Sequence, residues 1–415
     1  MDYLFTMFER MNWKPFSKMN LAKFLPLGIK WFEILPKLSR LFWWAVFTAL
    51  HRLPIYRQEP ERLYLVASQI SEDDLAELKA RSQFYLSVLP ACKFMKRVDV
   101  NLPIILSSDP ILVFGPRSKF LNWLCLRRPG TFDVDFRRNP QDGWAWSGLA
   151  DYVKPDPIKF PIYQERLKQH ANALKKKRGA SCYVFGTGPS LDKALERDWS
   201  DGIRIVCNTI VRDPVLWNHI CPDFIVAGDA IYHFGHTRFA RAFRRDLRAR
   251  MEKSVTQFVY PAQFHALVLR EFSEWEDRLF PIPAGWHRAV NIDLTHSFRL
   301  PNLGNVLGLL LLPLACTLSK HIYLMGFDGR APDDKLFWSN SLKHTYPEHM
   351  DELKRAHPRF FDYYVPASDP NKYVREYQGD QLEMALQHAE KMGWTFEMLH
   401  SSWTPALQKR YPGDK

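Results

Sequence analysis

A glycine-rich loop in the middle of the chain has the composition of a segment that holds a phosphate or a nucleotide. Its residues are Gly186, Thr187, Gly188, Pro189 and Ser190. The apolar run 182–185 before it is typical of a buried strand, and a helix is predicted from Leu191. Glycine lets a backbone approach a ligand closely, and the first N–H groups of a helix attract anions. The same residues also suit an ordinary strand-to-helix turn with Ser190 as the N-cap.

Three more polar residues lie at or just after the ends of apolar runs. They are Asn208, Asp229 and Asp328, and the runs span residues 203–207, 222–229 and 321–325. A fourth strand is expected at 256–259, and helical patterns at 214–220, 239–251 and 305–318 separate the runs. Strands that alternate with helices predict an α/β fold with one doubly wound, Rossmann-like parallel sheet. Because ligands bind beyond the carboxyl ends of such strands, we expect the four segments to form one site.

The bulk composition calls for an anionic partner. The chain has 415 residues, a net charge of +12 and an isoelectric point near 9.3. A hydrophobic content of 46% excludes global disorder and allows a full core. The six cysteines form no CxxC pair and no zinc spacing, so we expect reduced thiols in a cytosolic protein.

Residues 1–58 combine large aromatic side chains with single basic ones, and prolines divide them into short segments. Such amphipathic helices suit the headgroup region of an anionic membrane. A helical arm packed on the main domain or on another subunit is the alternative, and homo-oligomerisation is left open. No nucleic-acid motif is present. The longest early apolar run, 41–50, is too short to span a bilayer, and no signal peptide is recognisable, so we expect a peripheral protein on the inner face of the cytoplasmic membrane.

Residues 59–179 are predicted to be an accessory mixed α/β region. We expect strands at 63–67, 104–106 and 111–114, a helix opened by Ser71 and running to about residue 89, and loops over 127–148. A basic run, 175–178, closes the helix before the main domain. The main domain, 180–405, ends with an aromatic segment at 363–377 that would form a lid, a helix at 381–392 and a strand at 395–399.

The motifs of the main domain resemble those of the bacterial CMP-sialic-acid-dependent sialyltransferases. GTGPSL after a strand, CN at the end of the next strand, the Asn-Leu-Gly helix start and YLMGFDG are similar to that family's GNGPSL, CN, Ser-Gly and YLxGxDFY. The GxGPSL and PDxxxxxD features also resemble motility-associated glycosylation proteins and archaeal pterin pyrophosphokinases. The resemblance covers residues 180–405.

The resemblance implies an inverting, metal-independent sugar transfer in a Rossmann-like domain, a variant akin to GT-A. The glycine-rich loop would line the nucleotide phosphate and ribose, and Asn208 would bind the nucleotide or donor. Asp229 falls where the family has an asparagine, and Asn302 with Gly304 falls at its Ser-Gly pair. Thr187 and Arg330 depart from the family's asparagine and tyrosine. A sister family that uses another CMP-activated acid, such as Kdo, is therefore the alternative.

Transfer from a CMP-activated acidic sugar to a surface glycan needs a base and a group that stabilises the departing phosphate. His344 is the expected base, because imidazole titrates near neutral pH, and Asp328 is the alternative. His344 also fits a loop histidine without a chemical role. Arg330 would bind the phosphate, joined by Tyr346 and Lys343.

Two other interpretations of the site stay open. Asp229 and Asp328 are able to hold Mg²⁺, which would favour a pyrophosphokinase, although no third carboxylate has a convincing spacing. We expect no metal and no cofactor beyond the CMP-sugar itself. The last interpretation is a membrane-associated assembly protein without catalysis.

Overall fold

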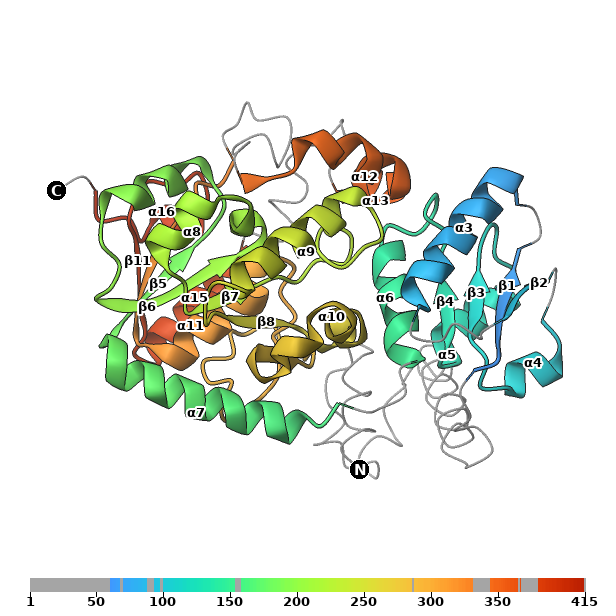
Figure 1. The fold of residues 1–415 in the computed structure, drawn as a ribbon, viewed down its shortest axis with the longest axis horizontal. Helices are drawn as coiled ribbons and strands as arrows, with labels where there is room; N and C mark the ends of the chain where they lie inside the picture. Colours follow the sequence, from blue (N-terminus) through green and yellow to red (C-terminus); the bar gives the residue numbers. More distant parts are fainter. Residues whose placement is uncertain are drawn as a thin grey trace, which may run out of the picture. The chain divides into compact units, whose positions relative to one another are not determined.

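The computed structural model describes residues 60–67, 70–87, 93–97, 100–153, 158–285, 287–330, 344–364, 366 and 380–413. The chain forms two compact units, Met1–Asp156 and Pro157–Lys415 (Figure 1). The predicted membrane-surface helices of residues 1–58, Lys343 and most of the expected lid lie outside the described residues. No helix in the described ranges is both long and apolar enough to cross a bilayer.

The described part of the smaller unit contains a four-stranded parallel sheet in the order β2-β1-β3-β4. Its strands are β1 (Arg62–Val66), β2 (Lys93–Arg97), β3 (Ile111–Val113) and β4 (Thr131–Asp133). Its helices are α3 (Glu72–Tyr85), α4 (Leu102–Leu106), α5 (Lys119–Arg127) and α6 (Asp142–Tyr152). The accessory region is thus a small α/β sheet of its own.

Two expectations for this unit are wrong. Residues 104–106 belong to α4 rather than to a strand, because the Asn101 side chain accepts a hydrogen bond from the Ile104 N–H and caps a helix there. Residues 127–148 contain β4 and most of α6 rather than loops. Helix α6 is held by a buried ion pair between Asp142 and Arg81 of α3, with oxygen and nitrogen 2.8 Å apart. The predicted strands at 63–67 and 111–114 are confirmed.

The larger unit confirms the α/β class, with a seven-stranded parallel sheet in its described residues. The order is β11-β10-β5-β6-β7-β8-β9. The strands are β5 (Ser181–Phe185), β6 (Gly202–Cys207), β7 (Phe224–Val226), β8 (Gln257–Pro261), β9 (Leu279–Ile282), β10 (His321–Met325) and β11 (Thr395–Met398). The principal helices are α7 (Phe160–Arg178), α8 (Pro214–Ile220), α9 (Arg238–Met251), α10 (His265–Phe272), α11 (Leu312–Leu318), α12 (Met350–Ala356), α13 (Pro358–Tyr364), α15 (Asp380–Lys391) and α16 (Pro405–Gln408).

Both faces of this sheet are covered, which is why its strands are almost continuously apolar. On one face, Cys182 and Val184 of β5 join a core with residues from α7, α11 and α15. On the other face, Tyr183 and Phe185 pack edge-on against Trp199. Helix α7 packs on β6, β9 and α11, so this unit begins one helix earlier than the expected boundary at residue 180.

The strand order places a topological switch point between β5 and β10. The chain runs outward from β5 to β9 and then returns through α11 to form β10 on the other side of β5. At such a point the loops that leave neighbouring strands diverge, and ligands bind there beyond the carboxyl ends. The glycine-rich loop follows β5 and the Gly326–Gly329 loop follows β10, so both leave the sheet at this point.

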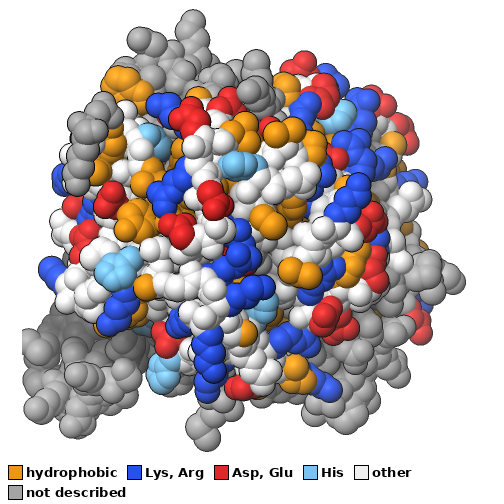
Figure 2. Space-filling view, turned by 60° about the vertical axis from the view of Figure 1, so that its left-hand side comes forward, with side chains coloured by type: hydrophobic (Ala, Val, Ile, Leu, Met, Phe, Trp, Pro, Cys, Tyr) orange, Lys and Arg blue, Asp and Glu red, His pale blue; other side chains and the backbone are white. Residues whose placement is uncertain are grey.

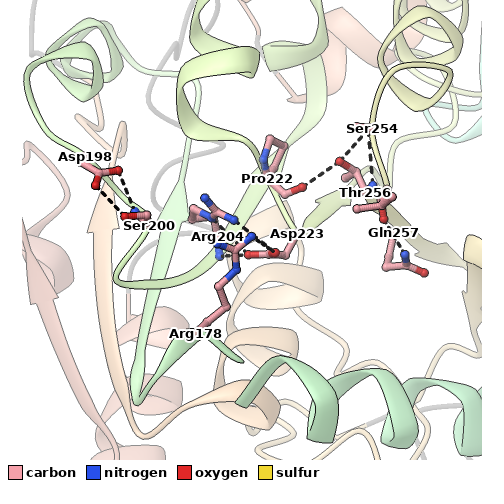
Figure 3. Close-up of polar contacts among 10 residues, drawn as sticks. Arg178, Asp198, Ser200, Arg204, Pro222, Asp223, Ser254, Thr256 and Gln257 are labelled. Carbon is pink, nitrogen blue, oxygen red and sulfur yellow. Dashed lines mark hydrogen bonds and ion pairs between the residues drawn. The ribbon is translucent and has the colours of Figure 1, made fainter. Parts of the chain in front are cut away.

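The amino ends of the middle strands are tied together by Asp223 (Figure 3). Its carboxylate accepts hydrogen bonds from the Arg204 backbone and guanidinium and pairs with Arg178 at 3.3 Å. Asp223 is the first carboxylate of the PDxxxxxD feature, and Asp229 is the second. Strand β7 separates them, so Asp223 has a structural role at the edge opposite the candidate site.

Candidate functional site

The expected strand-end residues come together at one edge of the larger sheet. Ser190 follows β5, Asn208 follows β6, Asp229 follows β7 and Asp328 follows β10. These strands are consecutive neighbours in the sheet, and all of them are parallel. The carboxyl edge therefore carries polar groups from four adjacent strands, as predicted.

The glycines of the loop after β5 allow this loop to pack closely against the loop after β10. The Gly186 N–H donates to the Met325 carbonyl, and the Gly188 N–H donates to the Gly326 carbonyl at 2.8 Å. A Cβ atom on Gly186 would lie 2.3 Å from the Gly326 oxygen, and one on Gly326, whose φ is +77°, would lie 2.4 Å from the Gly186 oxygen. No side chain fits between these backbones.

Asp328 and His400 come from other loops and contact Ser190 at the end of the loop after β5. The Ser190 N–H donates to the Asp328 carboxylate at 3.1 Å, and the Ser190 oxygen lies 2.8 Å from both Asp328 Oδ2 and His400 Nε2. The Gly326 N–H donates to His400 Nε2 at 2.9 Å, so the ring proton resides on Nδ1, 2.7 Å from the Ser401 carbonyl. The His400 ring thus links the loops after β5 and β10.

This arrangement corrects the expectation that the loop is an open phosphate cradle. The N–H groups of Gly188 and Ser190 are already bonded within the chain. The Asp328 carboxylate faces the loop, and a phosphate there would meet a like charge. Pro189 and Ser190 begin a 3₁₀ helix, η4 (Pro189–Glu196), rather than an α-helix. The loop is better suited to hydroxyl groups, which are able to donate to Asp328.

Asp229 starts a turn after β7. Its Oδ1 accepts hydrogen bonds from the Ile231 and Tyr232 N–H groups at 2.9 and 3.1 Å. Its side chain is partly exposed, but the surrounding atoms are dense enough that desolvation raises the pKa of the carboxyl to about 6. The two backbone hydrogen bonds lower this pKa only in part. A carboxyl with this pKa is able to exchange protons near neutral pH.

Asn208 begins a short 3₁₀ helix, η5 (Asn208–Arg212), and has a φ of +52°. A left-handed backbone is uncommon for a residue other than glycine and is frequent at functional sites. Its Oδ1 is buried, and no hydrogen-bond partner for it is seen among the described residues. The side chain lines a small pocket together with Thr209, Tyr232, His233 and Phe239.

His344 lies beside this site but is fully buried. Its Nε2 is 3.5 Å from Asp192 Oδ1 of η4, and its carbonyl accepts a hydrogen bond from Thr209. The segment is thus fixed against the loops after both β5 and β6. As the expected base, His344 would need a movement of its surroundings to reach an acceptor hydroxyl.

Tyr346 is not available to a departing phosphate, contrary to the expectation. It is 1% exposed, and its hydroxyl donates to Asp246 Oδ2 at 2.7 Å. Burial and the neighbouring carboxylate hold the pKa of this hydroxyl well above its usual value. Its ring packs against Phe239 and under the Arg212 guanidinium, so it anchors the segment on α9.

The remaining expected residues lie at the margin of the site. Arg330 is partly exposed and ends the described part of the loop after β10. Asn302 and Gly304 are exposed and precede a π-helix, η8 (Leu307–Leu311), which continues into α11. The Asn305 side chain accepts a hydrogen bond from the Gly308 N–H at 2.8 Å. Leu310 of this helix contacts Gly228, next to Asp229. Thr187 is partly exposed in the loop after β5.

Two histidines of the site were not among the expected residues. His400 follows β11, and His233 lies four residues after Asp229. The position of His400 directly after a predicted strand is a usable signal, because the other polar residues of the site share that position. Among the described residues, no group of three or more His, Cys, Asp or Glu side chains is placed to hold a metal ion.

No protein-family model, curated protein or solved structure matches this chain.

Replacing Gly326 with alanine tests the contact between the two loops. Gly393 has a similar φ of +95°, but no atom lies within 4 Å of the position that its Cβ would take, so Gly393→Ala is the matched control. We expect Gly393→Ala to lower the free energy of unfolding by about 1–2 kcal/mol, the cost of a left-handed alanine. Gly326→Ala should cost clearly more, because its Cβ meets the Gly186 backbone. Urea denaturation measures both, and equal losses would contradict the close contact.

The raised pKa of Asp229 predicts a pH-dependent effect of Asp229→Asn. Between about pH 4 and pH 6, the folded protein holds a proton that the unfolded chain has lost, so the wild type loses stability as the pH rises. Asparagine keeps the Oδ1 acceptor without the charge. We expect the unfolding free energy of Asp229→Asn to exceed that of the wild type by an amount that grows from near zero at pH 4 to about 1–2 kcal/mol at pH 7. A difference that stays constant over this range in urea denaturation would contradict the shift.

Proposed function

We propose that this protein is a glycosyltransferase that moves an acidic sugar, sialic acid or a Kdo-like acid, from a CMP-activated donor to a bacterial surface glycan. The observation that carries the proposal is the convergence of Ser190, Asn208, Asp229 and Asp328 at the carboxyl edge of four adjacent parallel strands. This is where nucleotides bind in doubly wound sheets. The choice of donor rests on the sequence resemblance.

The charges of the site suggest how the donor would lie. The Asp328 carboxylate, already bonded to Ser190, suits the ribose hydroxyls, which donate hydrogen bonds. The buried oxygen of Asn208 suits another donor group of the ligand. The phosphate would lie away from Asp328, toward Arg330, whose guanidinium binds phosphate oxygens in a bidentate way.

Asp229 is the base that the geometry favours. Its pKa of about 6 places it near the pH at which proton transfer is efficient, and its Oδ1 is fixed by two backbone N–H groups. In the proposed step, the acceptor hydroxyl gives its proton to Asp229 while its oxygen bonds to the anomeric carbon. The bond from that carbon to the phosphate oxygen breaks, and CMP leaves. His344 is the alternative base.

The basic charge of the chain suits an anionic surface. Helix α7 ends in exposed Lys175, Lys176 and Lys177. Figure 2 looks at the side on which this end of α7 lies in Figure 1, and it shows Lys and Arg side chains interspersed with Asp and Glu. Because α7 leads into the amino end of β5, this region lies opposite the carboxyl edge. It suits an anionic membrane, as proposed for residues 1–58, rather than the donor.

Ligand binding and turnover of Asp229→Asn test the proposal. Isothermal titration should show that the wild type binds CMP without Mg²⁺ and more tightly than Mg-ATP. Asp229→Asn should bind CMP with wild-type affinity but release CMP from the donor at least about a hundredfold more slowly, because the base is lost.

Three outcomes would contradict parts of this proposal. A preference for Mg-ATP would favour a pyrophosphokinase, and the absence of nucleotide binding would favour a non-catalytic assembly protein. Retained turnover in Asp229→Asn together with loss of turnover in His344→Asn would move the base to His344.

A further inference from the structure

The pocket between the ends of β6 and β7 contains two buried polar groups, Asn208 and His233, and the proposed chemistry gives no role to His233. Its walls are Asn208, Thr209, Tyr232, His233 and Phe239. Its enclosed part has room for about one group the size of a water molecule. Two of these residues, Asn208 and His233, have buried polar atoms for which no partner is seen among the described residues.

His233, one of the residues that line this pocket, carries a buried hydrogen-bond donor. The side chain is 2% exposed, and its Nδ1 accepts a hydrogen bond from the Asp229 N–H at 3.1 Å. A backbone N–H is only a donor, so Nδ1 carries the lone pair and Nε2 carries the proton. Burial and the nearby Arg244 lower the pKa of the ring to about 3, so the ring stays neutral and keeps this tautomer. The buried Nε2–H is the atom without a partner among the described residues.

Asn208 presents the matching acceptor. Its Oδ1 is buried without a partner in the described part of the chain, and its backbone is held in the left-handed region. The next residue, Thr209, is fixed by its bond to the His344 carbonyl and is not free to turn toward Asn208. A buried donor and a buried acceptor that both stay unsatisfied are costly, so a group that serves both is expected between them.

We propose that Asn208 and His233 form a subsite that recognises a single hydroxyl group of the sugar nucleotide. A hydroxyl accepts from His233 Nε2–H through its oxygen and donates its proton to Asn208 Oδ1. The subsite rests on the proposed function and specifies how that site would select its ligand. The hydroxyl belongs either to the ribose of the nucleotide or to the transferred sugar.

Other ligand groups fit the pocket less well. A phosphate would need a cation or several donors, whereas the ring of His233 is neutral and Asn208 Oδ1 is an acceptor. A nucleobase is larger than the enclosed space. A methyl group would leave both polar atoms unsatisfied.

Two substitutions of His233 separate its two nitrogen atoms. In His233→Asn, the side-chain oxygen is able to replace Nδ1 as the acceptor for the Asp229 N–H, but the donor at Nε2 is lost. In His233→Gln, the side-chain NH₂ reaches the position of Nε2 and keeps the donor. The ligands for titration calorimetry on the full chain are CMP, 2′-deoxy-CMP and CMP-sialic acid.

If the hydroxyl is that of the ribose, the wild type should bind CMP about ten- to a hundredfold more tightly than 2′-deoxy-CMP, and His233→Asn should remove this difference. If it belongs to the transferred sugar, His233→Asn should leave CMP binding unchanged and weaken CMP-sialic acid by a similar factor. In both cases His233→Gln should stay within about threefold of the wild type.

Asn208 supplies an independent check should His233→Asn fail to fold. Asn208→Gly tolerates the positive φ and lacks the acceptor, whereas Asn208→Asp keeps an acceptor oxygen, so only the glycine variant should reproduce the loss. Wild-type affinities of His233→Asn and Asn208→Gly for all three ligands would show that the pocket holds only water and would overturn the subsite while leaving CMP binding intact. A wild-type protein that binds no nucleotide would instead overturn the proposed function, and the subsite with it.

Discussion

The close contact between the loops after β5 and β10 constrains the whole carboxyl edge of the larger sheet. Gly186 and Gly326 approach so closely that neither position accepts a Cβ atom, and Ser190, Asp328 and His400 share one hydrogen-bonded cluster above them. The switch point, which is open in principle, is thereby filled by groups of the chain itself. The other polar groups of the edge, Asn208, Asp229 and His233, follow β6 and β7 on the neighbouring side.

The electrostatics of the site follow from this division. On the β5 side, a carboxylate disfavours phosphate and favours hydroxyl donors. On the β7 side, desolvation keeps His233 neutral and raises the pKa of Asp229 to about 6. These two residues are joined by the hydrogen bond from the Asp229 N–H to His233 Nδ1. The same turn therefore places the Asp229 carboxyl, with its pKa of about 6, next to the neutral ring of His233, which is a hydrogen-bond donor. This combination suits the selection and deprotonation of hydroxyl groups.

Most strands of the larger unit could be predicted because the hydrophobic pattern of parallel strands is local, but the edge strand β9 (Leu279–Ile282) was not among the expected strands. The strands that end at Phe185, Cys207 and Met325 could be predicted from their apolar runs, and so could the position of Ser190, Asn208 and Asp328 at the sheet edge. What a side chain does there depends on partners far along the chain. Asp328 meets Ser190 across 138 residues, and Tyr346 meets Asp246 across 100, so neither the filled loop nor the structural role of Tyr346 could be predicted. The expectation of a strand at residues 104–106 is wrong, because the Asn101 side chain caps a helix that begins at Leu102.

We propose that a nucleotide binds at the carboxyl edge of the larger sheet, between the loops that follow β10, β5, β6 and β7. Hydrogen–deuterium exchange of the full chain, measured with and without CMP, tests it most directly. We expect slower amide exchange in the segments 186–191, 208–212, 228–236 and 326–330 when CMP is bound, with the amino ends of the strands around Asp223 unchanged. Protection confined to the smaller unit or to the amino ends of these strands would contradict it.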